Sequence, residues 1–164
     1  DAQGGKSQYV YTQEYYSKKM NEKEAFRRRL LNYILSVLGI LMFVCSGIPK
    51  SAVNSSPFMG LADCLMFLLA FWLIYILIVM ARNKNHLTVW AFRVSALQFL
   101  FACIFSAAVC LFAAAFTIIY SLNILQSFSG TDIIGSVLRI LAAACFIIMS
   151  SLEYNTQYDI KYPE

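Results

Sequence analysis

Long apolar runs alternate with short polar segments along most of the chain. Four runs predict helices, at about residues 27–48, 58–82, 87–122 and 132–153. A helix that crosses a bilayer needs about 20 mostly apolar residues at a rise of 1.5 Å per residue. Because hydrocarbon offers the backbone no hydrogen-bond partner, a helix is the natural form for such a run. The pattern predicts an all-α integral membrane protein, whose main domain, residues 27–153, is a four-helix transmembrane bundle.

Two other interpretations of the apolar runs are excluded. A transmembrane β-barrel needs apolar and polar residues in alternation over segments of about ten residues, and the run LMFLLAFWLIYILIVM does not alternate. A signal peptide has an apolar region of about 7–15 residues close to the N-terminus. Here the first apolar run begins near residue 30 and further runs follow it.

The segments between the runs are short, and most basic residues fall in segments expected on one side of the membrane. Short connections make successive helices antiparallel, which predicts an up-down-up-down bundle. Lys and Arg are concentrated before the first run and between the second and third, so both termini are expected in the cytosol. The same pattern predicts a polar, tyrosine-rich N-terminal tail (residues 1–26) and a short C-terminal tail (154–164). We expect residues 13–29 to form a helix that leads into the membrane.

The composition agrees with this class and excludes several others. The chain is 60% hydrophobic and 13% charged, whereas soluble domains have about 45–50% apolar and about 25% charged residues. Nucleic-acid binding does not fit so much membrane sequence. The chain has one histidine, His86, and five cysteines without a CxxC pair. With no phosphate-binding loop, no nucleophile beside a base and no carboxylate pair in the sequence, we expect no catalytic, cofactor or metal site.

Two charged residues lie deep inside the predicted helices, away from their ends. Asp63 and Arg139 each lie about 10 Å from the outer end of a predicted helix, and a charge at this depth suggests a functional role. Their opposite signs suggest an ion pair that brings the second and fourth helices together. A proton or ion pathway, or two side chains that each reach the interface, are the alternatives. Glu153, at the inner end of the fourth helix, is expected to be solvated.

Basic residues form a collar where the first helix enters the membrane. Such residues attract anionic lipid headgroups at about 1 kcal/mol each near the surface, and they also set the topology. The predicted headgroup-binding residues on the inner face are Lys18, Lys19, Lys23, Arg27, Arg28, Arg29 and Arg93.

Small residues recur every four positions along the third helix. Ala102, Ser106, Cys110 and Ala114 form this stripe. Small side chains let helix backbones approach closely in membranes, so the stripe predicts a packing face. It serves either the bundle itself or self-association.

Three segments resemble those of the MARVEL group of four-helix membrane proteins. They are the first helix, FRRRLLNYILSVLGILMFVCSG, the alanine-rich third helix, VWAFRVSALQFLFACIFSAAVCLFAAA, and the fourth helix, LRILAAACFIIMSSLEY. The resemblance covers roughly residues 26–158. It implies membrane apposition, vesicle trafficking or lateral organisation without catalysis. We expect the protein in the plasma membrane or a vesicle, with an organelle membrane as the alternative. Claudins and tetraspanins are dissimilar, because they need a large outer loop with a cysteine motif.

We therefore expect a non-enzymatic tetraspan protein that organises membrane or vesicle assemblies through helix packing and lipid contacts. Its expected partners are anionic lipids on the inner face, and further copies of itself or other membrane proteins. An accessory subunit of a respiratory or proton-translocating complex is the alternative, because an ordered polar tail usually needs a partner. A small transporter or channel is the third interpretation, although the sequence has neither a broken helix nor a polar stripe.

Overall fold

A computed structural model of the chain describes residues 15–18, 22–49, 51–82, 87–123, 129–156 and 158–161. Its helices are α1 (Glu22–Gly47), α2 (Pro57–Arg82), α3 (Val89–Phe92), the π-helix η1 (Arg93–Gln98), α4 (Phe99–Asn123) and α5 (Gly130–Tyr154). The third apolar run contains α3, η1 and α4, which follow one another as a single continuous span, Trp90–Asn123. Within the described residues, four helical segments are long and apolar enough to cross a membrane, which confirms the predicted four-helix bundle.

Local chemistry sets where the helices begin. The first helix begins at Glu22, earlier than predicted, and Glu24 and Arg28 form an ion pair of 3.0 Å one turn apart in it. Before α2, the Ser56 hydroxyl accepts a hydrogen bond from the backbone N–H of Met59, and Pro57 occupies the first helical position. Before α5, Ser129 forms a capping box with Asp132.

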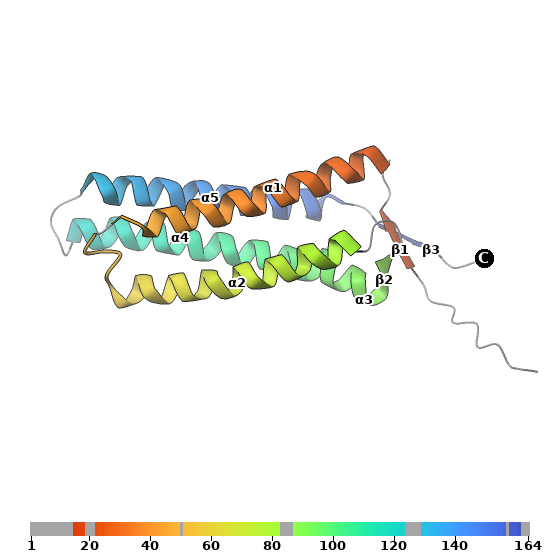
Figure 1. Ribbon diagram of the computed structural model, residues 1–164, viewed down its shortest axis with the longest axis horizontal. Helices are drawn as coiled ribbons and strands as arrows, with labels where there is room; N and C mark the ends of the chain where they lie inside the picture. The colour runs from red at the N-terminus through yellow and green to blue at the C-terminus, as the bar shows by residue number, and fades with distance from the viewer. Residues whose placement is uncertain are drawn as a thin grey trace, which may run out of the picture.

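The four spans are arranged in the order α1, α5, α4, α2. Helix α5 packs along both α1 and α4, and α2 packs on α4 while scarcely touching α1. Figure 1 shows the helices side by side, with the N-terminus of α1 and the C-terminus of α5 at the same end of the bundle. We call this the basic end, and the opposite end, where α1 is connected to α2, the loop end. Smaller shares of α1 and α2 than of α4 and α5 are buried.

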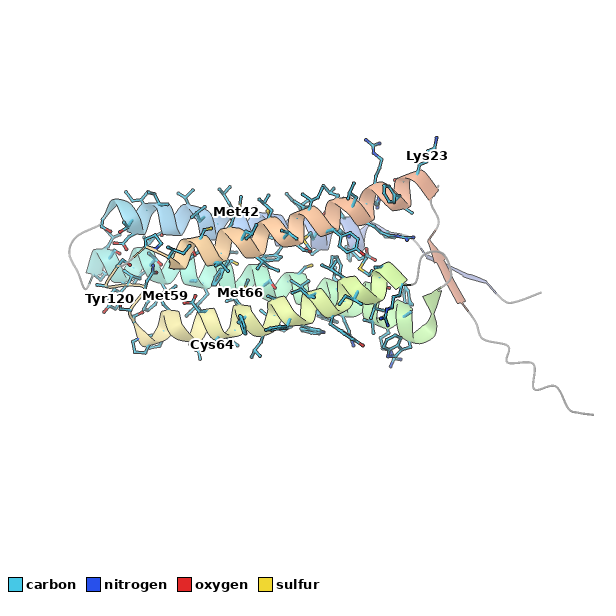
Figure 2. All side chains as sticks on the ribbon, viewed as in Figure 1. Lys23, Met42, Met59, Cys64, Met66 and Tyr120 are labelled. Carbon is cyan, nitrogen blue, oxygen red and sulfur yellow. The ribbon has the colours of Figure 1, made fainter. Side chains whose placement is uncertain are left out.

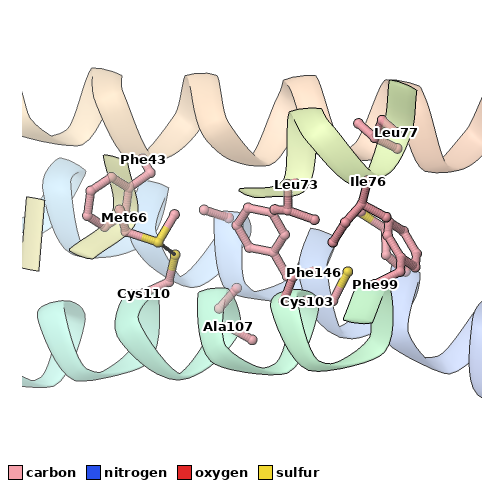
Figure 3. Close-up of a cluster of buried hydrophobic side chains, with 14 of the residues drawn as sticks. Phe43, Met66, Leu73, Ile76, Leu77, Phe99, Cys103, Ala107, Cys110 and Phe146 are labelled. Carbon is pink, nitrogen blue, oxygen red and sulfur yellow. Dashed lines mark hydrogen bonds between the residues drawn. The ribbon is translucent and has the colours of Figure 1, made fainter. Parts of the chain in front are cut away.

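Apolar side chains fill the centre of the bundle. Phe146 of α5, Leu73 of α2 and Cys103 of α4 lie together there, and all three are fully buried (Figure 3). Gly39 lets α1 approach α5 closely, because a Cβ at this position would lie 3.0 Å from Cζ of Phe146. The face of α1 that meets α5 also buries polar residues, among them Ser36, whose hydroxyl donates to the carbonyl of Asn32 at 2.7 Å.

A small antiparallel sheet at the basic end was not predicted. Strand β1 (Tyr15–Lys18) lies between β2 (Leu87–Thr88) and β3 (Tyr158–Lys161). In the register, Tyr15 lies opposite Thr88 on one side and Lys161 on the other. The expectation of a helix over residues 13–29 is therefore wrong at residues 15–18, which form β1, while residues 22–29 are helical. Tyrosine favours strands, and the two partner strands come from distant parts of the chain.

Candidate functional site

A buried arginine organises the loop end of the bundle. Arg139 of α5 is only 1% exposed. Its Nη1 donates to the hydroxyl of Thr117 on α4, and its Nη2 donates to Oδ1 of Asn54 at 2.8 Å. Asn54 lies in the connection between α1 and α2, and its own amide donates to the carbonyl of Pro49 at 2.8 Å. The guanidinium therefore ties this connection to the α4–α5 pair.

The predicted pair of Asp63 and Arg139 does not form a direct contact. Among the described residues, no ion pair within 4.0 Å joins them, and Arg139 donates to Thr117 and Asn54 instead. The reason is the helix order, because α2 packs on α4 and not on α5. Asp63 itself is exposed on the surface of α2.

An apolar groove runs between the loop-end part of α1 and the middle of α2. Its cavity volume is about 510 Å³, and it is lined by residues between 40 and 48, at the end of α1 and just after it, and between 63 and 74 of α2. The buried side chains of Phe43 and Met66 form part of its lining and lie next to each other (Figure 3). Asp63 is the charged residue in this lining.

The groove closes toward the basic end. There the phenolic hydroxyl of Tyr33 on α1 donates to the backbone carbonyl of Leu77 on α2 at 3.0 Å. This hydrogen bond joins the two helices on the side of the groove that faces the basic end. The lining of the groove thus ends before this hydrogen bond.

The predicted basic collar divides into residues of different accessibility. Lys23 and Arg27 are exposed at the start of α1, where Figure 2 shows Lys23 pointing away from the bundle. Arg28 instead holds α1 to the end of α5, because its Nη1 lies 3.4 Å from the carbonyl of Leu152 and 3.3 Å from Oγ1 of Thr156. The remaining members are Arg29, which is partly buried, Arg93, which is exposed on η1, Lys18, whose backbone lies in β1, and Lys19, which is outside the described residues.

The structure places the whole small-residue stripe of the third span in the interior. Ala102, Ser106 and Cys110 are 0% exposed and Ala114 is 2% exposed. Helix α4 packs on α5 and α2, and the thiol of Cys110 lies 4.0 Å from Sδ of Met66 on α2. Packing inside the bundle accounts for the stripe. Self-association through it is not available, because the chain itself covers these residues.

Other candidate groups have structural positions. Cys103, Cys110 and Cys145 are buried, while Cys45 and Cys64 are exposed, and all five are free thiols. No cluster suited to a metal ion occurs in the described part of the chain. Glu153 is buried, against the expectation that it is solvated, and it has an interaction partner there. The single histidine, His86, lies outside the described residues.

No protein-family model matches the chain, and comparison with curated proteins and with solved structures gave no match. The resemblance to the MARVEL group therefore stays a prediction. The sequence also did not indicate Asn54 and Thr117 as partners of Arg139. One available signal was Thr117 itself, a hydroxyl within an apolar run near the same end of the bundle as Arg139.

Proposed function

We propose that this tetraspan membrane protein is a non-enzymatic organiser of membrane or vesicle assemblies that acts through its lipid-facing surface. The observation that carries the proposal is the contrast between a packed interior and an open groove on the surface. Packed apolar side chains such as Leu73, Phe99 and Phe146 fill the centre of the bundle, while the groove between α1 and α2 opens sideways. This arrangement favours contacts with the surrounding membrane over passage through the protein.

The intramembrane arginine supports the same proposal. Charged residues inside membranes commonly mark ion or proton pathways. Here Arg139 is hydrogen-bonded to Thr117 and Asn54 and holds a loop in place. A structural role for this charge is a specific reason to rank the transporter interpretation third.

The basic end is proposed to face the cytosol. Lys23 and Arg27 are exposed there, in a position to meet anionic headgroups of the inner leaflet, whose attraction is about 1 kcal/mol for each basic residue near the surface. A plasma membrane or vesicle location and a MARVEL-like relationship belong to this proposal.

An accessory subunit of a larger complex is the second candidate. One observation favours it: the sheet at the basic end brings the N-terminal strand β1 beside β3 from the C-terminal region, and β2 and β3 are its edge strands. An edge strand offers free backbone groups to a partner chain.

Isolation of the full chain from its native membrane in polymer-bounded lipid discs tests these candidates. We expect the chain with lipid, alone or with further copies and non-catalytic membrane proteins. Recovery of catalytic subunits in a constant molar ratio would instead select the accessory role. Ion or proton flux into vesicles that contain only this chain would overturn the organiser function.

A further inference from the structure

The shape of the groove between α1 and α2 limits what can occupy it. Along α2 it runs from Asp63 to Ile74, about 16 Å at the rise of an α-helix. This length is about half of the roughly 30 Å hydrocarbon thickness of a bilayer. The hydrogen bond from Tyr33 to Leu77 closes the seam beyond it. The groove is therefore about as long as one leaflet is thick.

A transmembrane helix from a partner does not fit this shape. An α-helix with its side chains is about 10–12 Å wide, and it would have to continue through the half of the seam that Tyr33 closes. A single acyl chain is narrow and ends within its own leaflet. The geometry favours a lipid over a helix.

The chemistry of the lining selects among lipids. The groove walls are apolar except at Asp63, which lies at the end of the α2 lining nearest the loop end. The carboxylate is exposed, and no residue in the described part of the chain donates a hydrogen bond to it or forms an ion pair with it, so it can accept hydrogen bonds from a ligand. A carboxylate at the edge of an apolar slot is complementary to a cation that can donate hydrogen bonds.

We propose that the groove binds one acyl chain of a phospholipid with a primary ammonium headgroup, and that this ammonium donates hydrogen bonds to Asp63. The inference rests on the proposed function, because it names the lipid class that the lipid-facing surface recognises. A quaternary ammonium has no N–H to donate, and its methyl groups hold the charge away from the carboxylate. The site therefore distinguishes phosphatidylethanolamine from phosphatidylcholine with the same acyl chains.

Lipid retention by the purified full chain tests this assignment. The chain is transferred into detergent with equal amounts of phosphatidylethanolamine, phosphatidylcholine and phosphatidylglycerol of identical acyl chains, and bound lipid is counted by native mass spectrometry. We expect preferential retention of phosphatidylethanolamine. Asp63→Asn should weaken that retention about tenfold, the size expected for loss of one charge-assisted hydrogen bond, and Asp63→Glu should preserve the preference.

Two further variants separate the groove from the rest of the surface. Ala70→Trp fills the apolar slot and should reduce retention of all three lipids. Cys64→Asn places the same amide on the neighbouring exposed position of α2, which does not line the groove, and should leave the preference intact.

Several results would overturn the lipid assignment. These are equal retention of the ethanolamine and choline lipids by the unaltered chain, an unchanged preference in Asp63→Asn, or cross-linking of a partner helix to a photoreactive group at Phe67. None of them removes the organiser function, which depends on what is isolated with the chain in native lipid discs.

Discussion

At the scale of single residues, Arg139 is the side chain on which the loop end depends. An arginine at the centre of a membrane helix costs about 2.5–3.5 kcal/mol on insertion scales. Burial of the group here is compensated in part, because Thr117 and Asn54 accept from its two Nη atoms while its Nε has no hydrogen-bond partner among the described residues. Because Asn54 also donates to the carbonyl of Pro49, loss of Arg139 affects both the packing of α5 and the position of the connection.

Arg139→Gln is expected to lower the midpoint of thermal unfolding in detergent, because it leaves Asn54 without its donor and shortens the reach to Thr117. Hydrogen bonds to charged groups contribute about 1.5–3 kcal/mol. Asn54→Ala should destabilise the chain less, and the double variant should be milder than the sum of the two, because both remove the same hydrogen bond. Fluorescence-detected unfolding of the purified chain measures all three.

Arg93→Gln is the matched control, because Arg93 is exposed on η1, and it should leave the midpoint unchanged. A cycle of Arg139→Gln with Asp63→Asn should show weaker coupling than the cycle with Asn54→Ala. Strictly additive effects of Arg139→Gln and Asn54→Ala would contradict the hydrogen bond.

The sequence alone was enough to identify both intramembrane charges, but not the hydrogen-bond partners of Arg139. Opposite charges at similar depth suggest each other, so Asp63 was the expected partner of Arg139. The actual partners are neutral, and Asn54 lies 85 positions away along the chain. Only the packing of α4 between α2 and α5 decides which groups the guanidinium reaches.

At the scale of helices, the contact between α1 and α5 depends on a residue without a side chain. Gly39 faces Phe146, which is 0% exposed, and a Cβ at position 39 would lie 3.0–3.3 Å from atoms of its ring. At Gly60 of α2, in contrast, an added Cβ would meet no neighbouring heavy atom within 4 Å. The same glycine-to-alanine substitution can therefore be compared at a tightly packed helical position and at an open one.

Gly39→Ala is expected to destabilise the chain by about 1–3 kcal/mol, the usual cost of overpacking a buried contact. Gly60→Ala should leave stability unchanged or raise it slightly, because alanine is the better helix former. Thermal unfolding in detergent compares the two, and Phe146→Leu should relieve the defect of Gly39→Ala. If both alanine variants unfold alike, α1 and α5 are not as close as described.

Helices could be predicted well from apolar runs, because length and hydropathy are local properties. Their packing order could not, since the chain connects α1 to α2 but the structure joins α1 to α5. The groove follows from that order, so the sequence could indicate Asp63 but not the slot beside it. The sheet was missed because β1 pairs only with distant segments.

At the scale of the whole molecule, the sheet links the two tails to each other and to the start of the third span. Strand β1 pairs with β2 on one side and β3 on the other. In the second pairing Lys18 lies opposite Tyr158 and Tyr15 opposite Lys161. The order of the N-terminal strand thus depends on residues near the other end of the chain.

Deletion of residues 158–164 is expected to speed hydrogen–deuterium exchange at the backbone amides of residues 15–18, because β1 loses the partner along its full length. Deletion of residues 162–164, which lie beyond β3, is the control and should leave that exchange as it is. Hydrogen–deuterium exchange of both deletion variants is measured by mass spectrometry in detergent micelles. Equal exchange in the two deletions would show that β3 does not protect β1.

The joining of α1 to α5 also has a consequence for how the protein is made. Helices enter the membrane in the order of synthesis, so α1 arrives first and its main partner arrives last. Until then, the face of α1 that holds Asn32, Ser36 and Ser46, all buried in the finished bundle, is turned toward lipid or toward the insertion machinery. The newly inserted α1–α2 pair has little contact of its own to hold it. We therefore expect the polar face of α1 to need shelter, from a membrane chaperone or the translocon, until α5 is inserted.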